Sequence, residues 1–248
     1  FGLEHLRTLA FILVIAVVAF HADVGVVGGY LAVSGFFALS GYLLTSLLVA
    51  ELTSSGSIDV AGFYRRRVRR LAPAALATLS LVALGVLLGA PGSDGLSTDL
   101  AAAVAHVANW RFVSTGQEYS QIFSDPSPVA HFWSLAIEEQ FAFALPVVVV
   151  TASWLWQRRP SRRTSEVHRA SPGQGLALVF GAGAICSLAL MIAAGNHDWA
   201  HARWYYGTDT RAAELLVGAA AGAWAGGLGR ARSNSRWGPD LLAAAALL

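Results

Sequence analysis

Uncharged apolar runs about as long as a bilayer is thick recur through the 248-residue chain, and they limit its fold more than any other feature. A hydrocarbon core of roughly 30 Å requires about 20 helical residues, so each run is a candidate transmembrane helix. We predict an all-α, polytopic transmembrane helix bundle that forms a single domain over 1–248, truncated at its C-terminus. The expected spans are about 5–22, 29–50, 71–90, 131–156, 174–194 and 209–228, with a seventh, incomplete one at 239–248.

Composition excludes several other classes of protein. Hydrophobic residues make up 55% of the chain and charged residues 13%, which is too apolar for a soluble core inside a polar shell. The net charge of +2 gives no basis for binding nucleic acid. The one cysteine lies in an apolar run, and we find no cluster of metal ligands, no phosphate-binding glycine loop and no hydrolase nucleophile motif. We therefore expect neither a metal nor a permanently bound cofactor.

The arginines between the predicted spans determine the expected orientation. All 17 cationic residues are arginine, and most lie in clusters within 65–70, 158–169 and 230–236. With six crossings these clusters fall on one side, together with Arg7, and the positive-inside rule makes that side the cytoplasm. We expect a multi-pass protein of the plasma (inner) membrane with a cytoplasmic N-terminus.

One helical segment is too short to be counted as a crossing. Residues 98–112 have a helical period, but Asp99 and Arg111 lie near their ends. A crossing here would move the arginines of 158–169 to the outside. We therefore expect an interfacial or re-entrant helix within an outer loop at 91–130.

The first predicted span carries an arginine and a histidine on one face. Arg7 and His21 are about 21 Å apart along a helix and about 40° from eclipsed. Ionisable groups within a span are costly and tend to be functional, so this face is a candidate polar path. The alternative is that His21 only marks the water interface, two residues before Asp23.

A run of arginines, Arg65-Arg-Arg-Val-Arg-Arg, precedes the third predicted span. Guanidinium groups bind phosphate oxygens bidentately and keep their charge, so the cluster could clamp a polyphosphate. Arg67 and Arg70, at i and i+3, would point the same way if the helix begins here. The alternative is a cluster that anchors the inner loop or binds anionic lipid.

Two adjacent carboxylates, Glu138 and Glu139, lie near the outer end of the fourth predicted span. They could polarise a histidine or hydrogen-bond a sugar hydroxyl. Helix geometry splays them by about 100°, so at most one is expected to face a given site. The alternative is that they only complement the helix dipole.

Small residues predict where helices can approach closely. Gly181-Ala-Gly-Ala lies in the fifth predicted span and Gly218-Ala-Ala-Ala-Gly in the sixth. Such faces allow the backbones of neighbouring membrane helices to come together. We expect both to pack against other spans.

Five stretches resemble, in order, motifs of the membrane-bound acyltransferase-3 family, whose members O-acetylate lipopolysaccharide O-antigen, peptidoglycan and other glycans. The resemblance covers the whole chain, and the fourth stretch matches the family's H-F-W-S-L-A-x-E-E-Q-F block closely. The fifth resembles its T-R-x-x-E-L-L-x-G block. The stretches are Gly2-Leu-Glu-His-Leu-Arg-Thr-Leu-Ala, Gly28–Leu44, Phe63–Pro73, His131–Phe141 and Tyr205–Gly218.

The resemblance implies an acyltransferase that moves an acyl group, usually acetyl, from cytoplasmic acyl-CoA to a hydroxyl outside the membrane. It implies an essential histidine, a basic R-x-x-R element that binds the donor, a first-span arginine and an acid in the fourth-span block. These correspond to His21, to Arg67 and Arg70 (or Arg66 and Arg69 in an equally spaced register), to Arg7, and to Glu138 or Glu139.

Two departures from the family pattern affect these assignments. Thirteen residues, Thr8–Phe20, separate the first-span arginine and histidine, where the family usually has ten. Both spacings keep the two residues on one face. The second-span signature often has an aspartate before its Phe-Phe pair, and this chain has Ser34-Gly35 instead.

The expected mechanism places the CoA phosphates on the arginine cluster and threads the pantetheine arm along a polar path to His21. His21 would be the general base on the acceptor hydroxyl, with one of the two glutamates orienting it. The expected partners are acyl-CoA, a glycan or other cell-envelope acceptor, and the lipid bilayer; acyl length and oligomeric state stay open. One alternative is a transporter or flippase of a glycan or lipid intermediate, and another is a membrane scaffold without turnover.

Overall fold

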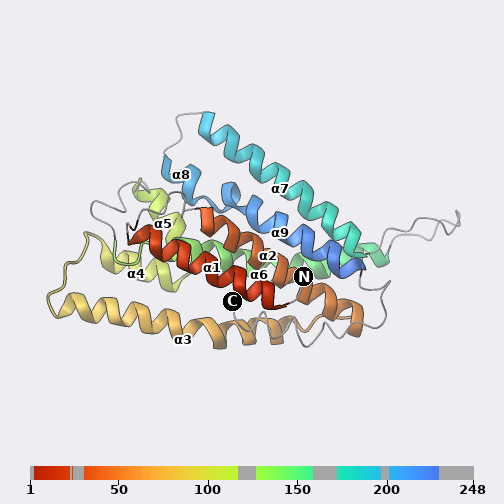
Figure 1. Cartoon of the computed structure of the whole chain (residues 1–248), viewed down its shortest axis with the longest axis horizontal. Helices are drawn as coiled ribbons and strands as arrows, with labels where there is room; N and C mark the ends of the chain where they lie inside the picture. Colours follow the sequence, from red (N-terminus) through yellow and green to blue (C-terminus); the bar gives the residue numbers. More distant parts are fainter. Residues whose placement is uncertain are drawn as a thin grey trace, which may run out of the picture. The chain divides into compact units, whose positions relative to one another are not determined.

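The computed structural model describes residues 3–22, 24, 31–116, 127–158, 172–196 and 201–228, without the side chains of residues 3, 4, 7, 21, 196, 201, 227 and 228. Within these ranges the chain is helical and contains no strand, so the predicted all-α class is confirmed (Figure 1). The helices are α1 (Leu3–His21), α2 (Leu31–Ser55), α3 (Val60–Leu87), α4 (Leu96–Val104), α5 (Ala108–Thr115), α6 (Phe132–Gln157), α7 (Pro172–Asn196), α8 (His201–Tyr206) and α9 (Thr208–Leu228).

Four of the described helices are long and apolar enough to cross a membrane, namely Leu31–Ser55, Val60–Leu87, Phe132–Gln157 and Pro172–Gly195. The surface of α3 agrees with a lipid environment, since Leu76, Leu81, Leu84 and Leu87 are all exposed. A row of leucines facing outward is unusual for a protein surface in water but ordinary for one in lipid. We therefore describe the chain as a membrane protein.

Helix α3 begins earlier than the sequence predicts. The expected start is residue 71, after the arginine cluster, whereas α3 begins at Val60 and contains the whole cluster. Asp59 caps this start, because its carboxylate accepts a hydrogen bond of 2.8 Å from the backbone N–H of Gly62. A Cβ at Gly62 would lie 1.9 Å from Asp59 Oδ2, so a larger residue there would displace the capping carboxylate. The predicted start is wrong, and the arginines are helical residues.

The segment 98–112, which we expected in an outer loop, forms two short helices instead of one. The chain leaves α4 at Val104 and enters α5 at Ala108, so the predicted continuous helix over 98–112 is wrong. His106, between the two, has a positive φ of 55°, which is uncommon for a residue other than glycine. Its carbonyl oxygen accepts a hydrogen bond of 2.8 Å from Gln140 of α6, and this bond stabilises the break.

The chain divides into two compact units, each with its own internal packing. Unit 1 comprises Phe1–Ile58, Ala144–Ile185 and Ala213–Leu248, and unit 2 comprises Asp59–Phe143 and Cys186–Ala212. In unit 1, α1 packs antiparallel on α2, with Leu6 and Ala10 against Leu39 and Leu43.

In unit 1 the backbones of α2 and α9 are in direct contact. A Cβ on Gly218 would lie 1.8 Å from the carbonyl oxygen of Ala38, and one on Gly222 would lie 2.4 Å from that of Tyr42. Only residues without a side chain allow helices to approach this closely. The predicted packing face Gly218-Ala-Ala-Ala-Gly is confirmed.

The other predicted small-residue face does not make such a contact. No atom lies within 4 Å of a Cβ built on Gly181, and one built on Gly183 meets only the Leu216 side chain, at 3.3 Å. The Gly181-Ala-Gly-Ala face therefore packs against α9 through Gly183, as expected, but at these two glycines it meets a side chain and not a neighbouring backbone. A small residue permits close approach, but a partner helix must lie opposite it.

Helices α2 and α9 run parallel to each other. Position 34 is bonded to 214, and 38 and 42 lie against 218 and 222, so the contacts advance in the same direction on both helices. Among the candidate spans, α3, α6 and α7 lie between α2 and α9 in the sequence, and an odd number of crossings returns the chain to the direction of α2. The parallel packing agrees with leaving 98–112 out of the crossings.

Replacing Gly218 tests the contact between α2 and α9. In Gly218→Ala the new carbon would lie 1.8 Å from the Ala38 oxygen, so the helices must separate. We expect a loss of about 1–3 kcal/mol of stability, as overpacking typically causes. The measurement is the thermal midpoint of the detergent-solubilised protein, followed by size-exclusion chromatography. Gly181→Ala is the matched control with open space, and equal midpoints for the two variants would contradict the packing.

Candidate functional site

A cluster of charged side chains joins α3 to α6 within unit 2. Arg67 Nε donates to Glu139 Oε1 at 2.8 Å, while Arg67 Nη2 lies 2.6 Å from that oxygen and 3.1 Å from Glu138 Oε1. The side chains of Arg67, Glu138 and Glu139 are 12%, 20% and 16% exposed. One guanidinium, largely withdrawn from the surroundings, therefore holds both carboxylates by charge-assisted hydrogen bonds.

The cluster corrects one expectation about the two glutamates. Helix geometry splays Glu138 and Glu139, and the sequence therefore predicts that at most one faces a given site. Both bind Arg67, so for this group the prediction is wrong. The reason is the shape of the guanidinium, which presents five N–H donors on a planar fork and can accept partners from two directions.

The charges of the cluster are close to balanced. A carboxylate or guanidinium removed from water costs several kcal/mol unless a partner compensates it, and two adjacent carboxylates also repel each other. Arg67 offsets one of the two negative charges. Arg70, half-buried one turn further along α3, interacts electrostatically with the like charge of Arg67 and with Glu138. The positive charge of Arg70 thus lies near the second carboxylate and offsets part of the negative charge that Arg67 leaves.

Contacts beside the cluster hold α3 and α6 in register. The ring of Tyr64 stacks on that of Phe143 with the centroids 5.1 Å apart. The Tyr64 hydroxyl also donates to the backbone carbonyl oxygen of Phe143. Tyr64 lies about one turn before Arg67, and Phe143 about one turn after Glu139, as two antiparallel helices in contact require.

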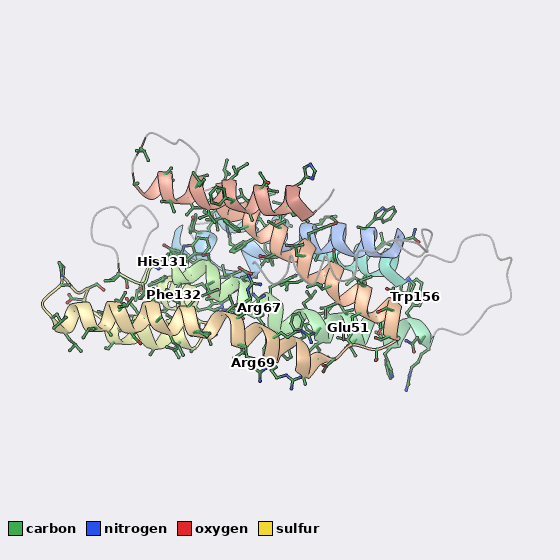
Figure 2. The ribbon with its side chains drawn as sticks, turned by 60° about the horizontal axis from the view of Figure 1, so that its bottom comes forward. Glu51, Arg67, Arg69, His131, Phe132 and Trp156 are labelled. Carbon is green, nitrogen blue, oxygen red and sulfur yellow. The ribbon has the colours of Figure 1, made fainter. Side chains whose placement is uncertain are left out.

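The other arginines of the cluster face away from α6. Arg65, Arg66 and Arg69 are exposed, whereas Arg67 and Arg70 are half-buried. Figure 2 shows Arg67 and Arg69 on opposite sides of α3. The two R-x-x-R pairs that the sequence leaves open, Arg67 with Arg70 and Arg66 with Arg69, therefore lie on different faces of α3. The face with Arg66 and Arg69 is accessible to a ligand, and the face with Arg67 and Arg70 is directed at α6.

The structure brings together two groups that the sequence places apart. The sequence predicts the arginines at the inner end of the third span and the glutamates near the outer end of the fourth. Arg67 instead contacts both glutamates, because the first turns of α3 already contain the cluster and lie against the first turns of α6. The early start of α3 at Val60 is the cause of this difference.

A buried amide network, which the sequence analysis did not single out, lies directly after the glutamates. Asn109, 0% exposed, donates from Nδ2 to the carbonyl oxygen of Tyr206 and to Thr208 Oγ1, both at 2.9 Å. Gln140 donates to Asn109 Oδ1 at 2.9 Å and accepts from the Thr208 hydroxyl at 2.6 Å. These bonds tie α5 and the start of α9 to α6. The signal was an amide side chain within each helical pattern, since buried amides require partners.

A second ion pair connects α8 to α9. Arg203 donates to both carboxylate oxygens of Asp209, each at 2.6 Å, and its guanidinium carbon lies 5.0 Å from the centre of the Trp110 ring. The hydrogen bond to Asp209 raises the pKa of Arg203. This pair joins α8 to the start of α9 within unit 2 and is partly exposed.

Two further predicted site residues lie on α1. His21 is the last residue of the helix, and Arg7 lies near its start. Their side chains are outside the described part of the structure, so their roles stay predictions.

In the ranges that the structure describes, no group of three His, Cys, Asp or Glu side chains is placed to hold a metal ion.

Removing the charge of Arg67 tests the cluster. In Arg67→Met the two carboxylates lose their shared partner, and we expect a loss of about 3–5 kcal/mol, as when one member of a buried pair is removed. The measurement is the thermal midpoint and the yield of folded protein in detergent. Arg69→Met, on the exposed face, is the control and should change neither. Adding Glu138→Gln and Glu139→Gln to Arg67→Met should restore the midpoint, and a triple variant as unstable as the single one would contradict the pairing.

Comparison with known proteins supplies a family match over the whole sequence. A family model described as an acyltransferase domain matches residues 1–248. The O-acetyltransferase OatA of Staphylococcus aureus (strain NCTC 8325) is 36% identical over 219 residues, which are 88% of this chain and 33% of the relative. OatA of Staphylococcus aureus (strain COL) matches to the same extent. The chain thus spans about a third of the length of these curated relatives. No solved structure gives a significant match.

Proposed function

Since the chain belongs to the acyltransferase-3 family, we propose that it is the membrane domain of an enzyme that transfers an acyl group, expected to be acetyl, to a hydroxyl of the cell envelope. The donor is cytoplasmic acyl-CoA, and the acceptor is a glycan or another extracytoplasmic molecule. The relatives support this assignment, because they are named O-acetyltransferases. The apolar helices support a site within the membrane.

The observation that carries the proposal is the division of the arginines between two faces of α3. Arg65, Arg66 and Arg69 are exposed, so their guanidinium groups are accessible to the phosphates of acyl-CoA. Arg67 and Arg70 lie on the α6 side of α3 and form, with Glu138 and Glu139, a polar cluster among apolar helices. We propose that the polar pantetheine arm enters the membrane region beside this cluster, because polar groups there need polar partners.

The chemical step is an attack of the acceptor hydroxyl on the thioester carbonyl. His21 takes the hydroxyl proton as the new C–O bond forms, since the imidazole pKa suits a general base near neutral pH. The C–S bond then breaks, and the proton passes to the CoA thiolate, which leaves as the thiol. Arg7, on the same face of α1 by helix geometry, belongs to the polar path between donor site and base.

Replacing His21 tests the chemical step. In His21→Ala we expect transfer of label from radioactive acetyl-CoA into envelope material to fall at least about 100-fold, because general-base catalysis contributes this much or more. The assay uses membrane vesicles that contain the full-length protein. Binding of CoA should be unchanged, which shows that the variant is folded. Transfer at the normal rate would remove His21 from the mechanism.

A second experiment tests the donor site. In the double variant Arg66→Gln/Arg69→Gln we expect the KM for acetyl-CoA to rise at least about 10-fold, since each lost phosphate contact is charge-assisted. The maximal rate at saturating donor should stay near normal. Arg158→Gln, which removes an exposed arginine after α6, is the control and should leave the KM unchanged. An equal KM in the double variant and the control would contradict the assignment.

A transporter or flippase of a glycan or lipid intermediate is the competing function. The same arginines would then bind a lipid phosphate, and His21 would lie on the transport path. Transport predicts movement of substrate without consumption of acyl-CoA. Transfer predicts release of free CoA that requires donor and acceptor together, and this release distinguishes the two functions.

A further inference from the structure

We infer that Trp110, Arg203 and Asp209 form a binding site for a sugar unit of the acceptor, where α5, α8 and the start of α9 meet in unit 2. The inference rests on the proposed function, in which an extracytoplasmic hydroxyl is the acceptor, and it selects a carbohydrate as the carrier of that hydroxyl. The three residues have no part in the donor site or in the chemical step proposed above. Their role follows from their exposure and from the contacts that hold them.

The first observation is that an indole ring and an ion pair lie side by side and are both accessible. The guanidinium carbon of Arg203 lies 5.0 Å from the centre of the Trp110 ring, within the range of a cation–π contact. Arg203 also binds both carboxylate oxygens of Asp209, each at 2.6 Å. Trp110 is 38% exposed, and the side chains of Arg203 and Asp209 are 26% and 39% exposed. All three can therefore touch a molecule outside the protein.

These side chains are of the types that bind sugars. A sugar ring has hydroxyl groups at its edge and C–H groups on its less polar face. The electron-rich face of an indole attracts those C–H groups and offers a large, rigid contact area. A carboxylate accepts hydrogen bonds from hydroxyls, and a guanidinium donates to their oxygens. Because Asp209 already balances the charge of Arg203, the site favours a neutral sugar over a phosphate.

The second observation is that a polar network holds Trp110 in place. Trp110 Nε1 donates to Gln140 Oε1 at 3.4 Å, and the same oxygen accepts from the Thr208 hydroxyl at 2.6 Å. Asn109, next to Trp110 and 0% exposed, is bonded to both Gln140 and Thr208. These bonds fix α5 to α6 and to the start of α9. A binding site requires such support, because side chains that are already ordered lose less entropy when a ligand binds.

The expected side of the membrane follows from the order of the helices. The segment between α6 and α7 contains most of the arginines of 158–169, and the positive-inside rule places it in the cytoplasm. With that segment inside, α7 ends outside, and α8 and the start of α9 follow it there. Helix α5 lies at this end too, because Asn109 donates to the Tyr206 carbonyl oxygen and to Thr208. The site is thus expected where an extracytoplasmic acceptor arrives.

The competing explanation is that Trp110 is an interfacial tryptophan of the aromatic belt. Trp154, near the end of α6, is a matched residue for that role. It is 48% exposed, and the Arg158 guanidinium carbon lies 3.7 Å from the centre of its ring. Both tryptophans therefore have an arginine beside them. Within the described ranges, a carboxylate completes the group at Trp110 and none does so at Trp154.

The test measures glycan binding and acetyl transfer with the detergent-solubilised, full-length protein. The probe is fluorescently labelled, soluble glycan fragments released from the envelope of the cells that carry the protein. In Trp110→Ala we expect the Kd of the fragments, and their KM as acceptors, to rise at least about 10-fold, as truncation of a central tryptophan does at binding sites. The KM for acetyl-CoA should stay within about 2-fold. Trp110→Phe should keep part of the affinity because it retains an aromatic face, and Trp154→Ala should bind as the unmodified protein.

Asp209→Asn tests the polar half of the site. The change nearly preserves the shape of the side chain but removes its charge, so we expect the affinity for the fragments to fall several-fold. This variant also decides the outcome if Trp110→Ala does not fold, as judged by its thermal midpoint; normal affinity in Asp209→Asn would then overturn the inference.

Three other results would overturn the sugar site. They are normal affinity in folded Trp110→Ala, an equal loss of affinity in Trp154→Ala, and no binding of the fragments by the unmodified protein. Failure of the proposed function looks different: the unmodified protein would bind the fragments through Trp110 but transfer no label to them from radioactive acetyl-CoA.

Discussion

Ionised groups inside a bilayer must find their counter-charges within the protein, and the bonds from Arg67 to Glu138 and Glu139 meet this requirement at the start of α3. The pairing turns one side of the arginine helix toward α6. It leaves Arg65, Arg66 and Arg69 on the other side. A run of five arginines that is uniform in sequence thereby becomes two surfaces with different chemistry, one that binds the neighbouring helix and one that is accessible to an anion.

Unit 1 is held together in a different way. Between α2 and α9 there is no ion pair among the described contacts; the two backbones touch at Gly218 and Gly222. Direct backbone contact leaves little freedom to slide, so the polar pair Ser34–Glu214, one turn away, is placed as a consequence of packing. In unit 2 the ion pairs of Arg67 with Glu138 and Glu139 determine the register of α3 against α6. In unit 1 the glycines that let the two backbones touch determine the register of α2 against α9.

Much of the fold was readable from the sequence because bilayer thickness imposes a length on apolar helices. The expected spans 131–156, 174–194 and 209–228 correspond to α6, α7 and α9 within about two residues at each end. The start of α3 was missed because the expected boundary followed the loss of charge, whereas the Asp59 cap and Gly62 begin the helix before the arginines. The break at His106 depends on a hydrogen bond from Gln140, a contact between distant segments that no local pattern contains.

The sequence predicts which residues belong to the candidate site, but it does not predict which of them are in contact. The arginines and glutamates stand out in sequence because charge is rare in apolar segments. Their direct contact depends on how far α3 is shifted along α6, which the Tyr64–Phe143 stacking helps to determine. Likewise, the network of Asn109, Gln140 and Thr208 joins three separate segments and becomes visible only when they are folded together.

Charge exchange between positions 67 and 139 is the most direct measurement of the central claim, that a shared guanidinium holds α3 to α6. Arg67→Glu alone places three carboxylates together, and the yield of folded protein in membranes should collapse. Arg67→Glu combined with Glu139→Arg restores the number of charges of each sign, and we predict that the yield recovers substantially. A double variant that accumulates no better than Arg67→Glu, or a single variant that accumulates normally, would show that the pair does not hold these helices together.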